Sequence, residues 1–318
     1  MDLQTKVDIL PSDLSIDYSH QILSLGSCFA DNIGRKLRES CFDVDVNPFG
    51  VLFNPLSIAH NIHLILDGYT FGEKDLVENK GLWHSFEHSG LFSDITMQGC
   101  LQKINSRYNH AIERMHNNHF LLITFGTAWV FESKKSGKIV SNCHKLPSSD
   151  FIRRKLTVSE IVDTYLSLIE KIRNQNSNVK ILFSVSPIRH LSDGAHENNI
   201  SKSTLHLAVD ELVRAIQGVN YFPAFEIMMD ELRDYRFYAT DMCHPSAQTV
   251  DYLYEKFCNS YCTPDTLNIK LRIDQLLKDI HHKPIHPQTE EYQRFVHAVS
   301  IRKALLIKEY PFLATRFE

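Results

Sequence analysis

The chain has 318 residues, of which 43% are hydrophobic and 23% are charged, with 12 glycines and 11 prolines spread along it. This composition is typical of a globular protein and excludes the collagen, coiled-coil and disordered classes. Thirty-eight acidic and 34 basic residues give a net charge of -4, so the chain offers no broad positive field for a nucleic acid.

The first 20 residues lack a basic start followed by an apolar run, so no secretory signal is expected. No segment approaches 18 consecutive apolar residues, and no membrane span is expected either. The seven cysteines are an odd number without a repeating framework, which favours reduced thiols and a cytoplasmic location. Because no C-x-x-C spacing accompanies them, we expect neither a metal site nor a cofactor.

The first predicted elements are a strand, a tight turn and a helix. Residues 20–25 are an apolar run before Gly26-Ser27, and the following segment places Phe29, Ile33 and Leu37 on one helix face. Residues 41–47 alternate as a strand does, and a loop punctuated by proline and glycine follows to residue 55.

The middle of the chain continues the alternation of helices and strands. We predict helices at 56–66 and 101–117, a buried strand at 119–126 and a hairpin at 130–140 that turns at Ser136-Gly137. Residues 67–97 show no clear pattern. We therefore expect insertions at 67–118 and 130–156.

The last third of the α/β pattern begins with a helix at 157–174, where Thr157 and Glu160 form a capping-box pattern. A buried strand at 179–187 and a helix at 204–218 follow, and another helix is expected to hold Pro245 in its first turn. Residues 263–318 are expected to be a helical extension, interrupted at 281–288, that packs on a domain formed by residues 1–262.

Strands that alternate with helices predict an α/β fold with a mainly parallel sheet between two helical layers. In such sheets reactive groups collect at the carboxyl ends of the strands. These ends are Gly26-Ser27, Gly126-Thr127 and Ser186-Pro187, so we expect the three junctions to border one crevice.

Ser27 has two interpretations. A serine at a helix start is usually an N-cap, because its hydroxyl accepts a hydrogen bond from a free backbone N–H group. A nucleophile would need a base, and Asp241 and His244 lie close enough in sequence for the carboxylate to hold one imidazole nitrogen. Asp241 could equally cap the helix that follows. Cys28 is a weaker alternative nucleophile, since it would lie one position inside the helix.

Several segments together carry a family resemblance. They are GSCFA (26–30), NPFGVLFNP (47–55), TFGTAWVFE (124–132), SNCHK (141–145), VSPIRH (185–190) and YFPAFEIMMDELRDYRFYATDMCHPS (221–246). In these segments the chain resembles the GSCFA family, which looks like a branch of the SGNH, or GDSL-like, hydrolases. The resemblance implies a three-layer flavodoxin-like fold in which Ser27 is the nucleophile, His244 its base and Asp241 the carboxylate that orients the base.

The same resemblance implies an oxyanion hole that includes the N–H groups of Ser27 and Gly50. The third donor departs from the pattern, because Ala128 stands where many relatives have asparagine. Either Thr127, Asn54 or Asn142 replaces the missing amide, or the hole has two donors. Loss of one donor costs about 10²–10³ in turnover in a well-studied protease.

The resemblance also suggests residues that line a substrate site: Asn54, Gly126, Asn142, His144 and Lys145. For the last three the alternative is a solvated loop after the hairpin. The expected function is that of a serine esterase or deacetylase on a small-molecule or carbohydrate ester. An O-acyltransferase with a carbohydrate acceptor and an inactive binding module of the same fold remain alternatives, and the oligomeric state is open.

Overall fold

The computed structural model describes residues 5–10 and 12–317 of the chain. The strands are β1 (Gln21–Gly26), β2 (Asp43–Val46), β3 (Leu76–Asn79), β4 (Leu82–Ser85), β5 (Phe120–Phe125), β6 (Trp129–Ser133), β7 (Ile139–Val140), β8 (Phe151–Lys155), β9 (Lys180–Val185) and β10 (Val219–Phe222). The helices are α1 (Cys28–Glu39), α2 (Pro55–Leu66), α3 (Met97–Met115), α4 (Val158–Gln175), α5 (Gly194–Ala215), α6 (Ala224–Glu226), α7 (Ala247–Tyr261), α8 (Pro264–Ile280) and α9 (Glu290–Glu309).

The central sheet has five strands in the order β10-β9-β5-β1-β2, and all of its neighbours pair in parallel. Numbered along the chain, this is the flavodoxin-like order 2-1-3-4-5. The register aligns Leu23 with Leu121 and Leu121 with Ile181, so apolar residues stand side by side across the sheet. The predicted α/β class with a parallel sheet is confirmed.

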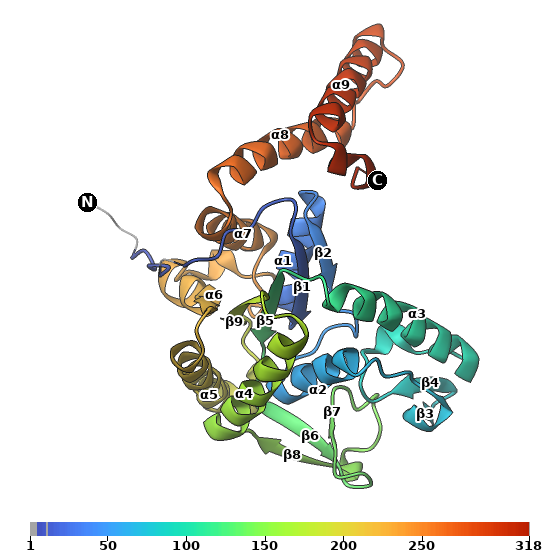
Figure 1. Cartoon of the computed structure of the whole chain (residues 1–318), viewed down its shortest axis with the longest axis vertical. Coiled ribbons are helices and arrows are strands. Elements are labelled where there is room, and N and C mark those ends of the chain that lie inside the picture. The colour runs from blue at the N-terminus through green and yellow to red at the C-terminus, as the bar shows by residue number, and fades with distance from the viewer. Residues whose placement is uncertain (1–4, 11, 318) are drawn as a thin grey trace.

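Helices cover both faces of this sheet (Figure 1). Alternate residues of β5 point to opposite faces: Leu121, Ile123 and Phe125 join one apolar cluster, whereas Phe120 and Leu122 join the other. Helices α2, α3, α4 and α5 contribute to the first cluster, and α1, α6 and α7 contribute to the second. Side chains that alternate on a strand buried on both faces thus build the three layers.

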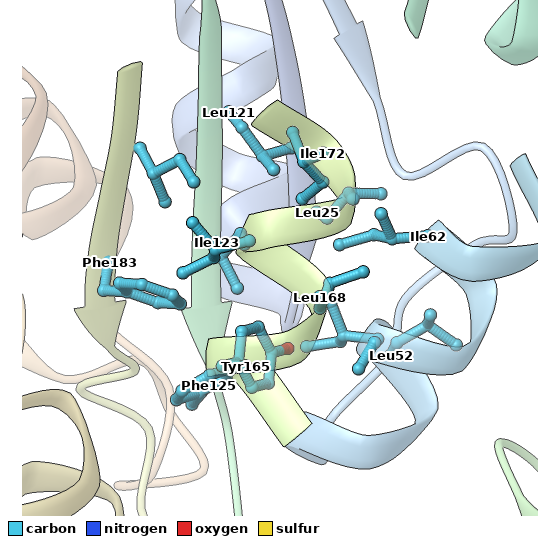
Figure 2. Packing of buried hydrophobic residues seen from close by; sticks show 14 of the residues in the cluster. Leu25, Leu52, Ile62, Leu121, Ile123, Phe125, Tyr165, Leu168, Ile172 and Phe183 are labelled. Carbon is cyan, nitrogen blue, oxygen red and sulfur yellow. The ribbon is translucent and has the colours of Figure 1, made fainter. Parts of the chain in front are cut away.

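Figure 2 shows the first cluster at close range, where α4 lies over the sheet. Tyr165, Leu168 and Ile172 of α4 project toward Ile123 and Phe183 of the strands. The fully buried Tyr165 donates its hydroxyl hydrogen to the carbonyl of Pro55 at 3.0 Å, which ties α4 to the start of α2.

Two small antiparallel sheets are present in addition to the central sheet. The predicted hairpin at 130–140 is confirmed as β6 and β7, and β8 adds a third strand that the sequence pattern did not indicate. The unassigned segment 67–97 contains the hairpin of β3 and β4. The α3 helix that follows is part of the main core, because Ile104, Tyr108 and Ala111 are fully buried there.

Helix boundaries differ from the predicted ones in two places. The α5 helix starts ten residues earlier than 204, at Gly194, since its first turns are mostly polar and lack an apolar stripe. Pro245 is not in the first turn of a helix, because α7 begins at Ala247 with Ser246 as its N-cap. The predicted capping box of Thr157 and Glu160 is present at the start of α4.

Helices α8 and α9 follow α7 and project away from the body of the molecule (Figure 1). They start beside Ile16, a few residues before β1, and so leave the molecule at the amino end of the sheet. Near the C-terminus, Leu313 is fully buried and the Arg316 guanidinium donates to the carbonyls of Tyr18 and Cys41. These contacts place the extension opposite the carboxyl ends of the strands. No helix of the described chain is long and apolar enough to cross a membrane.

Candidate active site

The strand order creates a crevice between β1 and β5. The chain leaves β1 toward β2 on one side and leaves β5 toward β9 on the other, so the two connections diverge at the carboxyl ends. Ligands of open α/β sheets bind at such a switch point. Ser27 follows β1 at this point and Gly126 follows β5.

Ser27 is the N-cap of α1, as its position predicts. Its Oγ accepts a hydrogen bond from the N–H of Phe29 at 3.3 Å, and its own N–H donates to the Thr124 carbonyl at 3.3 Å. The residue is only 1% exposed. The bond to Oγ is long, so capping leaves the hydroxyl weakly held and does not exclude a second role.

Gly126 brings the end of β5 directly against Ser27. A Cβ atom on Gly126 would lie 3.3 Å from the Ser27 Cβ and 3.0 Å from the Phe53 carbonyl oxygen. The N–H groups of Gly126 and Thr127 both donate to that same oxygen, at 2.8 and 2.9 Å. Two successive N–H groups that converge on one oxygen form an anion-binding geometry, which the Phe53 carbonyl fills here.

Asp241 and His244 form a pair within the loop before α7. Asp241 Oδ2 lies 2.6 Å from His244 Nδ1, and Asp241 Oδ1 accepts the N–H groups of Cys243 and His244, each at 2.9 Å. These hydrogen bonds hold the pKa of Asp241 at about 2, so the carboxylate is ionised. Since Ser246 caps α7, Asp241 is free of the capping role that the sequence left open.

The loop that carries this pair is itself folded back. An isolated bridge joins Tyr238 to Pro245, and the Ala239 N–H donates to the His244 carbonyl at 2.8 Å. Met242 in this loop has a φ of 58°, a backbone conformation that residues other than glycine adopt rarely. The side chains of His244 and Asp241 are 48% and 50% exposed, so the outer nitrogen of the imidazole is accessible.

The structure does not assemble a complete triad. Among the hydrogen bonds of the described residues, none joins the Ser27 hydroxyl to the His244 imidazole. His190, which follows β9, contacts Phe53 near Ser27 and is also within electrostatic range of His244. Its ring packs edge-on against Phe53 with centroids 5.8 Å apart, and burial lowers its pKa to about 4 with contributions from the charges of Lys202 and His244.

The donors expected for an oxyanion hole are engaged elsewhere. The Gly50 N–H donates to the Asn47 carbonyl at 2.8 Å, and the Thr127 hydroxyl lies 3.1 Å from Ser201 Oγ. Asn54 caps α2, where its side chain contacts the N–H and the hydroxyl of Ser57. Ala128 is fully buried in the first core cluster, so this position does not face the crevice.

Asn142, His144 and Lys145 belong to a different part of the surface. His144 is buried, stacks on His84 with ring centroids 4.4 Å apart, and bonds the Ser85 carbonyl through Nε2 at 2.7 Å. Asn142 Oδ1 accepts the His144 N–H at 2.8 Å. The segment is therefore packed on the β4 region rather than being a solvated loop, although Lys145 is exposed. Among the described residues, no hydrogen bond joins this segment to Ser27 or His244.

The cysteines and the candidate metal ligands do not form a second reactive centre among the described residues. Burial, together with Asp31, raises the pKa of the Cys28 thiol, which disfavours a thiolate at that position. Among the described residues there is no group of three or more His, Cys, Asp or Glu side chains that could hold a metal ion.

A sequence model of the GSCFA family matches residues 21–257, which span β1 to the last part of α7. The chain belongs to the GSCFA family. The matched region contains Ser27, Asp241 and His244 and leaves out α8 and α9. No curated protein matches the chain.

Among solved structures, the GSCFA chain is similar to an acetyl xylan esterase (Est2A) from the rumen bacterium Butyrivibrio proteoclasticus. The two share 9% identity with a TM-score of 0.38, and the match covers 76% of this chain and 63% of that one. The matched part is thus less than two thirds of the length of the esterase.

Sequence reasoning missed Lys202, which the GSCFA chain buries beneath the crevice. The residue is 2% exposed, and its Nζ donates to the carbonyls of Gly126 at 2.6 Å and Ser186 at 2.7 Å. A signal was present, because Lys202 stands three positions before the buried Leu205 and ten before the buried Leu212. A lysine on the apolar stripe of a helix indicates a buried cation.

Proposed function

We propose that this GSCFA protein is a serine hydrolase of acyl esters, related to the SGNH hydrolases, with Ser27 as nucleophile, His244 as base and Asp241 as the orienting carboxylate. The observation that carries the proposal is the 2.6 Å contact between Asp241 and His244. It fixes the imidazole with one nitrogen bonded to a carboxylate, and no hydrogen bond from the described residues engages the other nitrogen, as nucleophilic catalysis requires.

In this mechanism the free nitrogen of His244 removes the Ser27 proton while Oγ bonds to the acyl carbon, whose oxygen gains negative charge. The alkoxide leaving group takes the proton from the imidazolium as its bond to the acyl carbon breaks. Water then repeats the sequence on the acyl-enzyme and releases the acid. An acetyl ester of a carbohydrate is the substrate that the SGNH resemblance suggests.

The proposal requires a movement, because Ser27 is buried and no hydrogen bond joins it to His244 within the described residues. The exposed loop around Met242 is the segment suited to move, since it presents His244 outside the core. The reactive arrangement would form when this loop closes over the crevice and Ser27 Oγ exchanges its weak hydrogen bond from the Phe29 N–H for contacts with His244 and the acyl carbon.

The test is reaction with a fluorophosphonate probe together with turnover of p-nitrophenyl acetate. We expect the probe to label Ser27 and both signals to disappear in Ser27→Ala. Because Ser27 also caps α1, the matched control is Thr157→Ala, which removes the N-cap of α4 and costs about 1 kcal/mol of stability without affecting either signal. Labelling of another residue, with Ser27 unmodified, would refute the nucleophile assignment.

A binding module is the second candidate, and a specific observation favours it. Ser27 is 1% exposed, and the Gly50 and Thr127 N–H groups already have partners at 2.8 and 2.9 Å. A module of this kind would show no labelling and no turnover, whereas a panel of acetylated and free oligosaccharides would raise its melting temperature.

A further inference from the structure

Lys202 occupies a point where two strands of the sheet separate. Pairing between β5 and β9 ends with Phe125 opposite Val185, and the next carbonyls, those of Gly126 and Ser186, both accept from the Lys202 ammonium. The Nζ–O distances of 2.6 and 2.7 Å are short, as expected for charged donors. The ammonium therefore holds the two strand ends together.

The positive charge has no carboxylate partner among the described residues. Three other charged or titratable groups interact electrostatically with this ammonium: Arg189 and His190 after β9, and His206 on α5 itself. From α6, the ring of Phe225 faces it with its centroid 5.8 Å from Nζ. Burial of an unpaired charge is unfavourable, and an apolar side chain would fill the same space at lower cost. A role in packing alone does not account for a lysine here.

One of the two bonds connects Lys202 to the crevice. The carbonyl of Gly126 and the N–H of Thr127 belong to the same peptide group, so a cation on the carbonyl polarises that N–H and makes it a stronger donor. The same peptide lies against Ser27, as the 3.3 Å approach of a Gly126 Cβ to the serine Cβ shows.

We propose that Lys202 is a positioning residue of the candidate esterase site, which fixes the Gly126–Thr127 peptide beside Ser27 and polarises its N–H. That N–H donates to the Phe53 carbonyl in this structure, and in the reaction the oxygen that becomes negative takes the place of this carbonyl. The inference rests on the proposed function. It names a source of electrostatic stabilisation for a site in which the buried Ala128 supplies no side-chain donor.

The first measurement is the kinetics of Lys202→Met, which removes the charge and both donors but keeps an unbranched side chain. We expect kcat on p-nitrophenyl acetate and the rate of fluorophosphonate labelling to fall about 10- to 100-fold. The KM should change much less, since the interaction strengthens only as negative charge develops. The matched control is Lys171→Met, which removes a surface lysine that bonds Asp67 at 2.6 Å and should leave both rates unchanged.

The second measurement is the pH profile of kcat, which separates charge from packing. Burial, with a contribution from Arg189, lowers the pKa of Lys202 to about 7. The wild type should therefore lose activity as the pH rises through this region, because deprotonation removes the cation. Lys202→Arg keeps a permanent charge and should retain activity into the alkaline range.

The outcomes are distinct. Wild-type protein without Ser27-dependent labelling or turnover overturns the proposed function and the inference together. Turnover that depends on Ser27 but is equal in Lys202→Met overturns the inference alone. If Lys202→Met does not fold, the pH profile of Lys202→Arg decides. If its activity declines at alkaline pH as in the wild type, the role of the charge is overturned. If its activity is retained at alkaline pH, the role of the charge is supported.

Discussion

Gly26 is the residue that allows β1 to turn into the start of α1, and Gly26→Ala tests this. Its φ is +137°, and an added Cβ would lie 2.2 Å from the carbonyl oxygen of Thr124, a backbone atom that cannot rotate away. The unfavourable φ costs about 1–3 kcal/mol, and forcing β1 from β5 adds a similar amount. We expect a loss of about 3–5 kcal/mol in the free energy of unfolding, measured by urea denaturation.

Gly68→Ala provides the comparison, because Gly68 also has a positive φ, of +59°, but nothing lies within 4 Å of an added Cβ. It should cost only about 1–2 kcal/mol. If the two variants lie within about 1 kcal/mol of each other, the close approach of β1 and β5 does not govern the geometry at Ser27. In Gly26→Ala, labelling of Ser27 should also slow, since the serine moves with the strand.

Three further outcomes follow from the site and the core. Asp241→Asn should lower kcat about 10²–10⁴-fold in ester turnover, because the amide can no longer hold the His244 tautomer that accepts the proton. Ala128→Asn should cost about 2 kcal/mol in urea denaturation and leave turnover no higher than in wild type, since its position is in the core. Burial lowers the pKa of His88 to about 3. The unfolded chain therefore binds the proton first, and stability should fall by up to about 1.4 kcal/mol per pH unit below about pH 6.5, a slope that His88→Leu should reduce.

The fold was predictable to the extent that it depends on local patterns. The run before Gly26 and the run at 119–126 are mainly apolar and lack a regular alternation with polar residues, as is typical of strands buried on both faces. Strand β10 has no clear sequence signal, because its four residues mix apolar and polar side chains. The start of α5 lacks a sequence signal because the first turns of this helix are polar. The packing of SNCHK on β4 depends on residues far away in sequence.

The candidate site likewise combines local features, which the sequence indicates, with long-range features, which it does not. The contact between Asp241 and His244 spans three residues, so the sequence alone could indicate it, and the N-cap position of Ser27 is equally local. The relation of Ser27 to His244 is set by the whole sheet and by a loop exposed at its edge, and no local pattern specifies it.

Lys202 shows why residue types alone leave a site incomplete. Its partners are the carbonyls of Gly126 and Ser186, which carry no side-chain signal and become acceptors only because two strands end side by side. The motif residues supply a nucleophile and an imidazole, but backbone groups set the electrostatics around them. A charge that acts through a peptide group can therefore lie outside every motif, and in this fold it lies on the helix that connects β9 to β10.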